Sequence, residues 1–168
     1  MKKNLLTAIA VLLAHFCFAQ SGKIAIGIGA EFDPLANQSY SSIYKAGFGG
    51  NLKGLYGVGS RGQITLTAGY LSFGGKSGVQ YGDQTLSLIP VLAGYRYNFE
   101  GGLYGELQAG MGSLTTKASG FSFNQTNFAA ALNIGYVYNN FDFSARYYTE
   151  GDVISMFALR IGYNFSIK

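Results

Sequence analysis

Large apolar residues recur at every second position in eight stretches of the chain, and small or polar residues stand between them. This two-residue period is typical of a β-strand with one apolar face. The stretches are residues 24–32, 46–56, 64–70, 86–99, 103–111, 128–138, 141–147 and 157–165. No stretch beyond residue 22 keeps the 3.6-residue period of an amphipathic helix, so the pattern predicts an all-β protein.

The fourth stretch changes phase within itself. Leu86 and Leu88 occupy positions of one parity, whereas Val91 and the large apolar residues after it occupy positions of the other. Pro90 stands at the change, and its missing backbone N–H is tolerated at a β-bulge. The sequence therefore predicts a bulge at Pro90.

The connections between the stretches alternate in length. Residues 33–43, 74–84 and 115–126 are long and polar, whereas the other connections are short. The short ones are residues 57–62, 99–102, 139–140 and 149–153, although the last stands where the alternation would place a long loop. This order predicts an up-and-down antiparallel sheet with most of its long loops at one end.

Charged residues in or directly beside the eight apolar stretches fall opposite the large apolar residues. They are Glu31, Lys45, Lys53, Arg96, Glu106, Asp142, Arg146 and Arg160. A soluble lipocalin-like barrel would need this face as its outer coat, and glycine with eight charges covers a surface poorly. A charge facing lipid at mid-bilayer costs about 2–4 kcal/mol, so an outer-membrane barrel keeps such charges in its lumen. An open sheet edge is not viable in hydrocarbon. The pattern favours a closed eight-stranded antiparallel up-and-down transmembrane β-barrel, with the soluble barrel as the alternative.

Aromatic residues gather at the short-turn ends of the predicted strands. They are Tyr56, Tyr95, Tyr97, Phe99, Tyr136, Tyr138, Phe141, Phe143, Tyr163 and Phe165. Amphipathic rings are favoured at a membrane–water boundary, so these residues predict an aromatic girdle there.

The N-terminus has the features of a secretory signal peptide. Lys2 and Lys3 precede an apolar core at residues 5–18, and Ala19 is the small residue before the expected cleavage site. We therefore expect a signal peptide at residues 1–19 and one barrel domain at residues 20–168.

Cleavage would remove His15 and Cys17, the only histidine and cysteine of the chain. The mature chain then has no means of forming a disulfide, a Cys/His zinc site or a histidine-based catalyst. Its formal net charge falls from +4 to +2 with the loss of Lys2 and Lys3, which argues against a nucleic-acid partner. A charged fraction of 12% would suit a helical membrane protein, but only the short N-terminal apolar run approaches a bilayer span.

Three segments carry a resemblance to a known family. Residues 86–99 hold a proline and end in aromatics, residues 103–112 are rich in glycine, and residues 160–165 end in Phe165. They resemble strands of the small outer-membrane β-barrel proteins of Gram-negative bacteria, of the OmpA-transmembrane-domain and OmpX type. The resemblance implies an outer-membrane location, contact with membrane lipid, and a closing strand whose aromatic end is read by the barrel-assembly machinery.

The predicted lumen charges are the first functional candidates. Arg96 and Glu106 flank a short turn and should face each other as a cross-strand ion pair. An eight-stranded barrel is just wide enough to be filled by side chains, so we expect a filled lumen and a structural or surface-interaction role. A narrow passive pore is the alternative.

Catalysis and cofactor binding have little support in the sequence. Known outer-membrane barrel enzymes rely on a histidine, so we expect no enzyme, and we expect no cofactor or metal. The carboxylates of Asp33, Asp83, Glu150 and Asp152 are expected to be solvated loop charges. Residues 57–62 match G-x-G-x-x-G, but a strand follows them where a nucleotide site needs a helix, so they predict a turn.

The long loops combine aromatic rings with Ser, Asn and Gln, a composition that suits adaptable recognition of a protein or glycan. The candidate recognition residues are Tyr40, Tyr44, Tyr81, Phe121 and Phe123.

Overall fold

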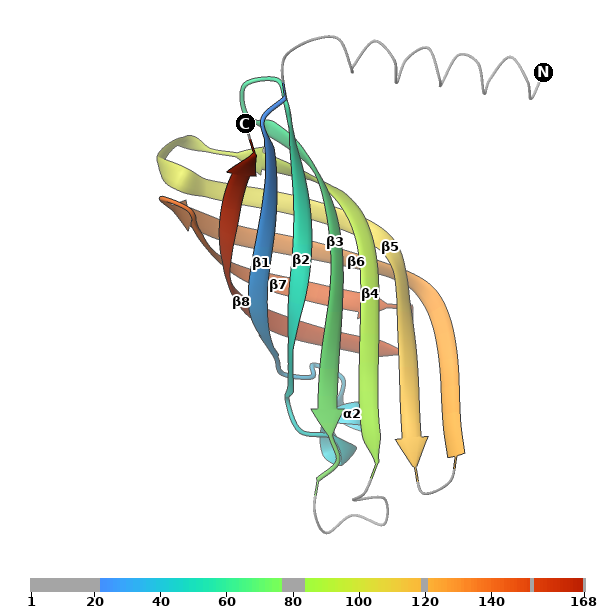
Figure 1. Ribbon diagram of the computed structural model, residues 1–168. Helices are drawn as coiled ribbons and strands as arrows, with labels where there is room; N and C mark the ends of the chain where they lie inside the picture. The colour runs from blue at the N-terminus through green and yellow to red at the C-terminus, as the bar shows by residue number, and fades with distance from the viewer. Residues whose placement is uncertain (1–21, 77–83, 119–120, 152, 168) are drawn as a thin grey trace, which may run out of the picture.

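A computed structural model describes residues 22–76, 84–118, 121–151 and 153–167. They form one closed barrel in which the strands neighbour one another in chain order (Figure 1). The strands are β1 (Ile24–Asp33), β2 (Gly47–Val58), β3 (Gly62–Gly74), β4 (Thr85–Asn98), β5 (Leu103–Ala118), β6 (Phe121–Tyr138), β7 (Phe141–Glu150) and β8 (Ile154–Ile167). The predicted signal peptide lies outside the described residues.

Each strand pairs antiparallel with its neighbours, and β1 closes the barrel by pairing with β8 from Ile24↔Ile167 to Phe32↔Leu159. Closure gives both edges of every strand a hydrogen-bonding partner along the shared barrel wall. The prediction of an eight-stranded antiparallel up-and-down barrel is confirmed.

The two ends of the barrel differ in their connections. The turns after β2, β4 and β6 lie at one end, together with the start of β1 and the end of β8, and we call this the turn end (Figure 1). The turns use left-handed backbone at Gly59 (φ 67°) and Asn139 (φ 54°), where glycine and asparagine are tolerated. The G-x-G-x-x-G segment is such a turn, because β2 ends at Val58 and β3 begins at Gly62.

The opposite end, which we call the loop end, carries the single described α-helix, α2 (Gln38–Ile43). Asn37 caps it by accepting a hydrogen bond from the Ser39 backbone N–H at 3.0 Å. No helix in the described ranges is long and apolar enough to cross a membrane.

The prediction of a long polar loop at residues 115–126 is wrong. Strands β5 and β6 continue pairing to Ala118↔Phe121, because threonine and phenylalanine in this polar segment favour extended backbone. β7 reaches β6 only at Ala129↔Glu150, so the first part of β6 has β5 as its only partner strand among the described residues, while β5 itself stays paired with β4 as far as Thr85↔Lys117 (Figure 1). We call residues 111–118 and 121–128 the projecting hairpin.

The predicted bulge at Pro90 is also wrong. Pro90 pairs with Gly112 on β5, and the β3–β4 pairs Ala68↔Val91 and Leu71↔Leu88 keep one register on either side of it. A barrel strand can lose one N–H bond to proline while the ladder on its other side continues. Leu88 and its even-numbered neighbours on β4 therefore face the lumen rather than the outside.

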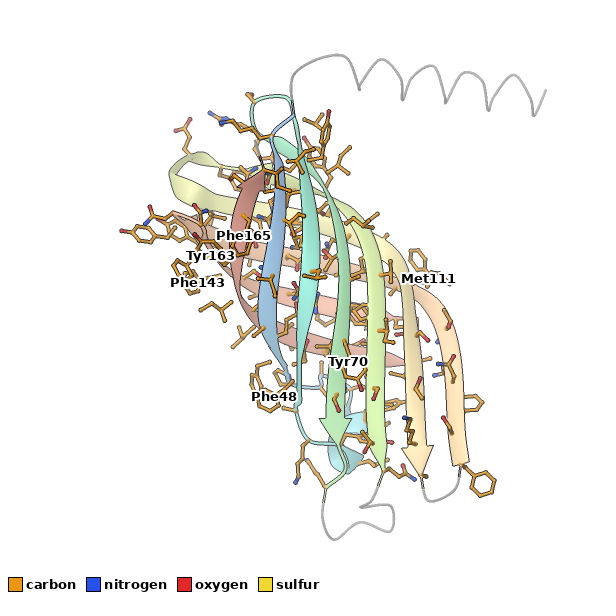
Figure 2. All side chains as sticks on the ribbon, in the orientation of Figure 1. Phe48, Tyr70, Met111, Phe143, Tyr163 and Phe165 are labelled. Atoms are coloured by element: carbon orange, nitrogen blue, oxygen red, sulfur yellow. The ribbon has the colours of Figure 1, made fainter. Side chains whose placement is uncertain are left out.

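The outer face of the barrel is apolar and the lumen holds nearly all the charged residues of the strands, as the alternation predicts. Leu132 is 57% exposed on the outer face, whereas Arg160 is 6% exposed and Glu106 is 1% exposed in the lumen. Exposed large apolar side chains occur on all eight strands. Phe48, Tyr70, Met111, Phe143, Tyr163 and Phe165 illustrate how they project away from the barrel wall (Figure 2). A soluble lipocalin-like barrel would have the opposite polarity.

Candidate functional site

The half of the lumen nearer the turn end holds a network of buried charges. We call Lys53, Arg96, Glu106, Asp142 and Arg160 the ionic cluster. The Glu106 carboxylate accepts from Lys53 Nζ at 2.8 Å and from Arg96 Nη2 at 3.3 Å. The Thr65 hydroxyl donates a third bond to it at 2.6 Å. The register pairs Arg96 directly with Glu106, as the turn between them predicts.

Asp142 is the second carboxylate of the ionic cluster. It lies 3.1 Å from Arg96 Nη2 and 3.4 Å from Arg160 Nη1, and Tyr104 OH donates to it at 2.6 Å. The Arg96 guanidinium also lies 3.7 Å from the centroid of the Tyr104 ring, a cation–π contact. Arg160 Nε donates to the Asn51 side chain at 3.0 Å. These hydrogen bonds offset part of the cost of removing the charges from water. Arg96 Nε and both Nη atoms of Arg160 are buried without a hydrogen-bond partner among the described residues.

A second, smaller group of charges lies further toward the loop end. Arg146 Nη2 donates to Glu31 at 2.6 Å and lies 3.7 Å from Asp33 Oδ1. Asp33 is fully buried, and neither of its carboxylate oxygens has a hydrogen-bond partner among the described residues. Two carboxylates thus share one guanidinium, so this group carries excess negative charge.

The expectation that Asp33 and Glu150 are solvated loop charges is wrong. Both are fully buried, because β1 and β7 continue through these positions with inward-facing side chains. Glu150 accepts from Tyr148 OH at 3.0 Å and from Asn127 Nδ2 at 3.1 Å. Asp83 and Asp152 lie outside the described residues.

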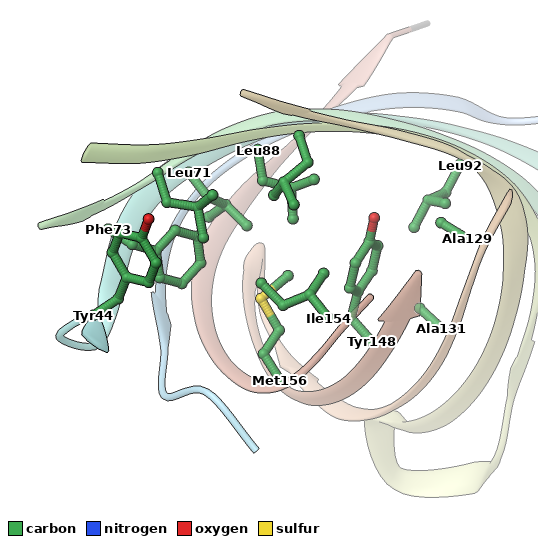
Figure 3. Close-up of a cluster of buried hydrophobic side chains, with 12 residues drawn as sticks. Tyr44, Leu71, Phe73, Leu88, Leu92, Ala129, Ala131, Tyr148, Ile154 and Met156 are labelled. Atoms are coloured by element: carbon green, nitrogen blue, oxygen red, sulfur yellow. The ribbon is translucent and has the colours of Figure 1, made fainter. Parts of the chain in front are cut away.

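The loop-end half of the lumen is filled by apolar side chains, which we call the apolar plug (Figure 3). The plug consists of Tyr44, Leu71, Phe73, Leu86, Leu88, Leu92, Leu114, Ala129, Ala131, Tyr148, Ile154 and Met156. Residues from the connections pack against it, including Leu35 and Ile43. The change of phase at Leu86 and Leu88 is one sequence signal of the plug, and the predicted bulge concealed it.

Seven of the eight predicted lumen charges face the lumen, and Lys45 does not. Lys45 is exposed between α2 and β2, with its backbone N–H bonded to the Gly74 carbonyl at 2.8 Å. Its assignment to the lumen is wrong because β2 begins only at Gly47, so the strand alternation does not extend to it.

All ten predicted girdle residues lie on the outer face toward the turn end, and we call them the turn-end aromatic band. A loop-end aromatic band, which the sequence analysis missed, consists of Phe32, Phe48, Tyr70, Phe128, Tyr147 and Phe157. On β8, Phe157 and Phe165 are about 27 Å apart along the strand at 3.4 Å per residue. A tilt of about 40° reduces this to a height of about 20 Å, close to the apolar band of an outer-membrane barrel.

The five candidate recognition residues have different environments. Tyr44 is only 4% exposed and donates to Gln84 Oε1 at 3.0 Å, so the prediction that it is a free recognition residue is wrong. It is buried because α2 folds it onto the plug, and this burial raises the pKa of its phenol. Tyr40 is half-buried and stacks on Tyr44, with ring centroids 6.2 Å apart. Tyr81 lies outside the described residues.

Phe121 and Phe123 are the most accessible candidates, 84% and 65% exposed on the projecting hairpin. They have the same strand parity as Ala129, which faces the lumen. They are exposed because, within the described residues, β7 does not extend alongside this part of β6.

No group of three or more His, Cys, Asp or Glu side chains within the described ranges could hold a metal ion. Glu31, Glu106 and Asp142 instead accept hydrogen bonds from arginine, lysine and hydroxyl donors.

Several solved structures have a similar barrel. Ail, the attachment invasion locus protein of Yersinia pestis, is 23% identical, with 87% of this chain and 100% of that chain covered and a TM-score of 0.59. Neisserial surface protein A is 16% identical, with 88% and 100% covered and a TM-score of 0.58. The N-terminal β-barrel domain of Pseudomonas aeruginosa OprF is 21% identical, with 86% and 100% covered and a TM-score of 0.53. These likenesses show the fold.

No protein-family model and no curated protein sequence matches the chain.

Proposed function

We propose that this chain is an integral outer-membrane β-barrel with a filled, non-conducting lumen, and that its projecting hairpin binds an extracellular protein. The observation that carries the membrane location is the outer surface between the two aromatic bands. Of the charged residues described on the eight strands, only Lys117 is exposed, and it lies near the hairpin tip. A surface of this composition suits hydrocarbon and would be poorly soluble in water.

Biogenesis follows from the same proposal. Residues 1–19 would direct export and be removed, and the barrel-assembly machinery would read the aromatic end of β8 at Phe165. The fold shared with Ail and OprF supports this route.

Gel migration tests the membrane location. We expect the chain in the membrane fraction, released only by detergent, as a compact SDS-resistant species that migrates differently after boiling. Release of the folded chain into an aqueous fraction would contradict the proposal.

The filled lumen predicts no conductance. The ionic cluster fills the turn-end half of the lumen, and the apolar plug with the smaller charged group around Arg146 fills the loop-end half, as expected for an eight-stranded barrel. Purified protein in a planar bilayer should therefore show no unitary currents. Stable unitary currents would instead support the alternative of a small passive pore.

The projecting hairpin supports the binding role. Residues 121–127 of β6 have no partner strand on the β7 side among the described residues, so their backbone groups are open to a further strand. Strand addition uses these groups for affinity and neighbouring side chains for specificity. Phe121 and Phe123 provide exposed apolar surface beside this edge. Among the similar structures, Ail is named for attachment and has been solved with the heparin analogue sucrose octasulfate.

Adhesion of cells displaying the chain tests this role, with separate coatings of extracellular-matrix proteins and heparin. We expect F121S/F123S to reduce adhesion to a protein coating about tenfold or more, as when central aromatic anchors are truncated. Lys117→Gln is the control, because it keeps both rings and removes the exposed hairpin charge. Adhesion to heparin that depends on Lys117 and not on the rings would show a glycan partner instead.

A further inference from the structure

The turn end has a small recess beside the turn-end aromatic band. Its volume is about 290 Å³, and it is lined by Lys23, Arg61, Ser60, Gln63, Asn98 and four glycines of the adjoining backbone. The segment before β1, the β2–β3 turn and the end of β4 meet there. Most of the G-x-G-x-x-G segment lines the recess, and the proposed function assigns this segment no role.

Main-chain hydrogen bonds fix the walls of the recess. The Gly57 N–H donates to the Lys23 carbonyl at 3.0 Å, which extends the β1–β2 ladder by one step. The Asn98 backbone N–H and its side-chain amide both donate to the Arg61 carbonyl, at 2.8 and 3.0 Å. The backbone of both cationic residues is therefore held in place.

Glycine allows two tyrosines to pack closely against the wall of the recess. A Cβ atom at Gly22 would lie 2.6 Å from the Tyr56 ring, and one at Gly62 would collide with the Tyr95 hydroxyl. Gly59 adopts a φ of 67°, which turns the chain tightly around the recess. Tyr56 and Tyr95 belong to the turn-end aromatic band, so the recess lies at the level of lipid headgroups.

The charge of the recess is positive. Lys23 forms no ion pair with another described residue. Arg61 Nη2 lies 2.6 Å from Glu100 Oε1, but both side chains are largely exposed and such pairs contribute little. A guanidinium has five N–H donors, so further donors of Arg61 remain for a second anion.

We propose that this recess binds a phosphate group, the chemistry shared by a phospholipid headgroup in the adjoining leaflet and free phosphate. The cations of Lys23 and Arg61 supply the charge-assisted bonds, and the polar side chains of Ser60 and Gln63 complete the lining. Phosphate recognition at a glycine-rich turn needs donors and space rather than a particular fold. The proposed phosphate site therefore does not depend on the helix that a nucleotide-binding G-x-G-x-x-G motif needs.

The test uses the full barrel folded in octyl glucoside, a detergent without phosphate. Dihexanoylphosphatidylglycerol below its micelle concentration, inorganic phosphate and phosphate-free dihexanoylglycerol are titrated separately. The readout is the NMR chemical shift of the Gly57, Gly59 and Gly62 amides. We expect saturable shifts with both phosphate-containing probes and none with dihexanoylglycerol.

Substitution of the two cations makes the test specific. Each removed charge should weaken binding about fivefold, so K23Q/R61Q should bind about 25-fold more weakly. K45Q/K76Q is the matched control, since it removes two cations at the loop end and should bind as the natural chain does. Tighter binding of the lipid than of inorganic phosphate identifies a headgroup, and equal binding identifies free phosphate.

The proposal is overturned if neither phosphate probe gives a saturable shift, or if K23Q/R61Q binds unchanged. Heat-modifiable migration of K23Q/R61Q shows that the barrel has folded. Binding of inorganic phosphate does not depend on the membrane location, so this proposal and the proposed function fail separately.

Discussion

The two halves of the lumen have the same strands and the same inward-facing geometry, but opposite chemistry. The ionic cluster near the turn end joins three cations to two carboxylates. The loop-end half is mostly the apolar plug, with the smaller charged group around Arg146 beside it. The ionic cluster depends on the strand register, because each carboxylate accepts hydrogen bonds from residues on several different strands. The stability of the apolar plug depends mainly on how well its side chains fill the available volume.

This difference should decide how each half responds to substitution. Removing one partner of a buried ion pair leaves an uncompensated charge in a low dielectric. Removing a buried methyl group leaves a cavity whose cost depends on how far the neighbours relax.

Glu106→Gln should have the largest effect, a loss of about 3–5 kcal/mol of unfolding free energy. It removes the charge that Lys53 and Arg96 share while it preserves shape. Urea unfolding in phospholipid vesicles measures the loss. Glu100→Gln, in the exposed pair with Arg61, is the control and should leave stability unchanged. Equal stability of E106Q and the natural chain would mean that the cluster is not an energetically coupled unit.

Leu88→Ala should destabilise the apolar plug by about 3 kcal/mol, within the range for buried leucine truncations. Leu88 is fully buried, whereas the adjacent Ile89 faces outward. Ile89→Ala is therefore the control, with a smaller loss expected because it leaves no internal cavity. The same urea titration compares the two variants. A larger loss in I89A would show that the plug contributes less than the outer surface.

Asp33→Asn should raise stability by about 1 kcal/mol, since it removes a buried charge that lacks hydrogen bonds. The variant also removes its repulsion with Glu31, which keeps its 2.6 Å bond from Arg146. Glu31→Gln, which takes away that stronger partner, should be destabilising and serves as the comparison. Lower stability of D33N would show that Arg146 requires both carboxylates.

Lys45→Gln should have the smallest effect, with no measurable change in unfolding, because Lys45 is exposed beyond the start of β2. Lys53→Gln, on the same strand but 3% exposed and bonded to Glu106, should be clearly destabilising. Urea titration of the pair compares one residue type inside and outside the lumen. A comparable loss in K45Q would contradict its exposed placement.

The ionic cluster was more readily predicted than the plug for a physical reason. A charge such as Arg160 among outward-facing Leu159 and Ile161 marks the inner face, because a charge in lipid is costly. Leu88 does not identify the inner face in this way, since a leucine is compatible with either face of the barrel wall. The phase change at Pro90 was therefore interpreted as a bulge, although the register on both sides is continuous.

The candidate recognition residues also differ in how well the sequence predicts their environment. Phe121 and Phe123 were selected by composition as loop residues, but they are strand residues raised above the barrel. Tyr44 had the same composition signal and is buried. Exposure depends on where a segment packs, which local composition does not specify.

The strand alternation, the number of strands and the apolar outer face follow from local sequence, because a two-residue period and the cost of a charge in lipid act locally. The length of the projecting hairpin, the apolar plug and the partners of each buried charge are set by the fold as a whole. These depend on the stagger of strands around a closed barrel, which brings together residues as distant in sequence as Glu31 and Arg146.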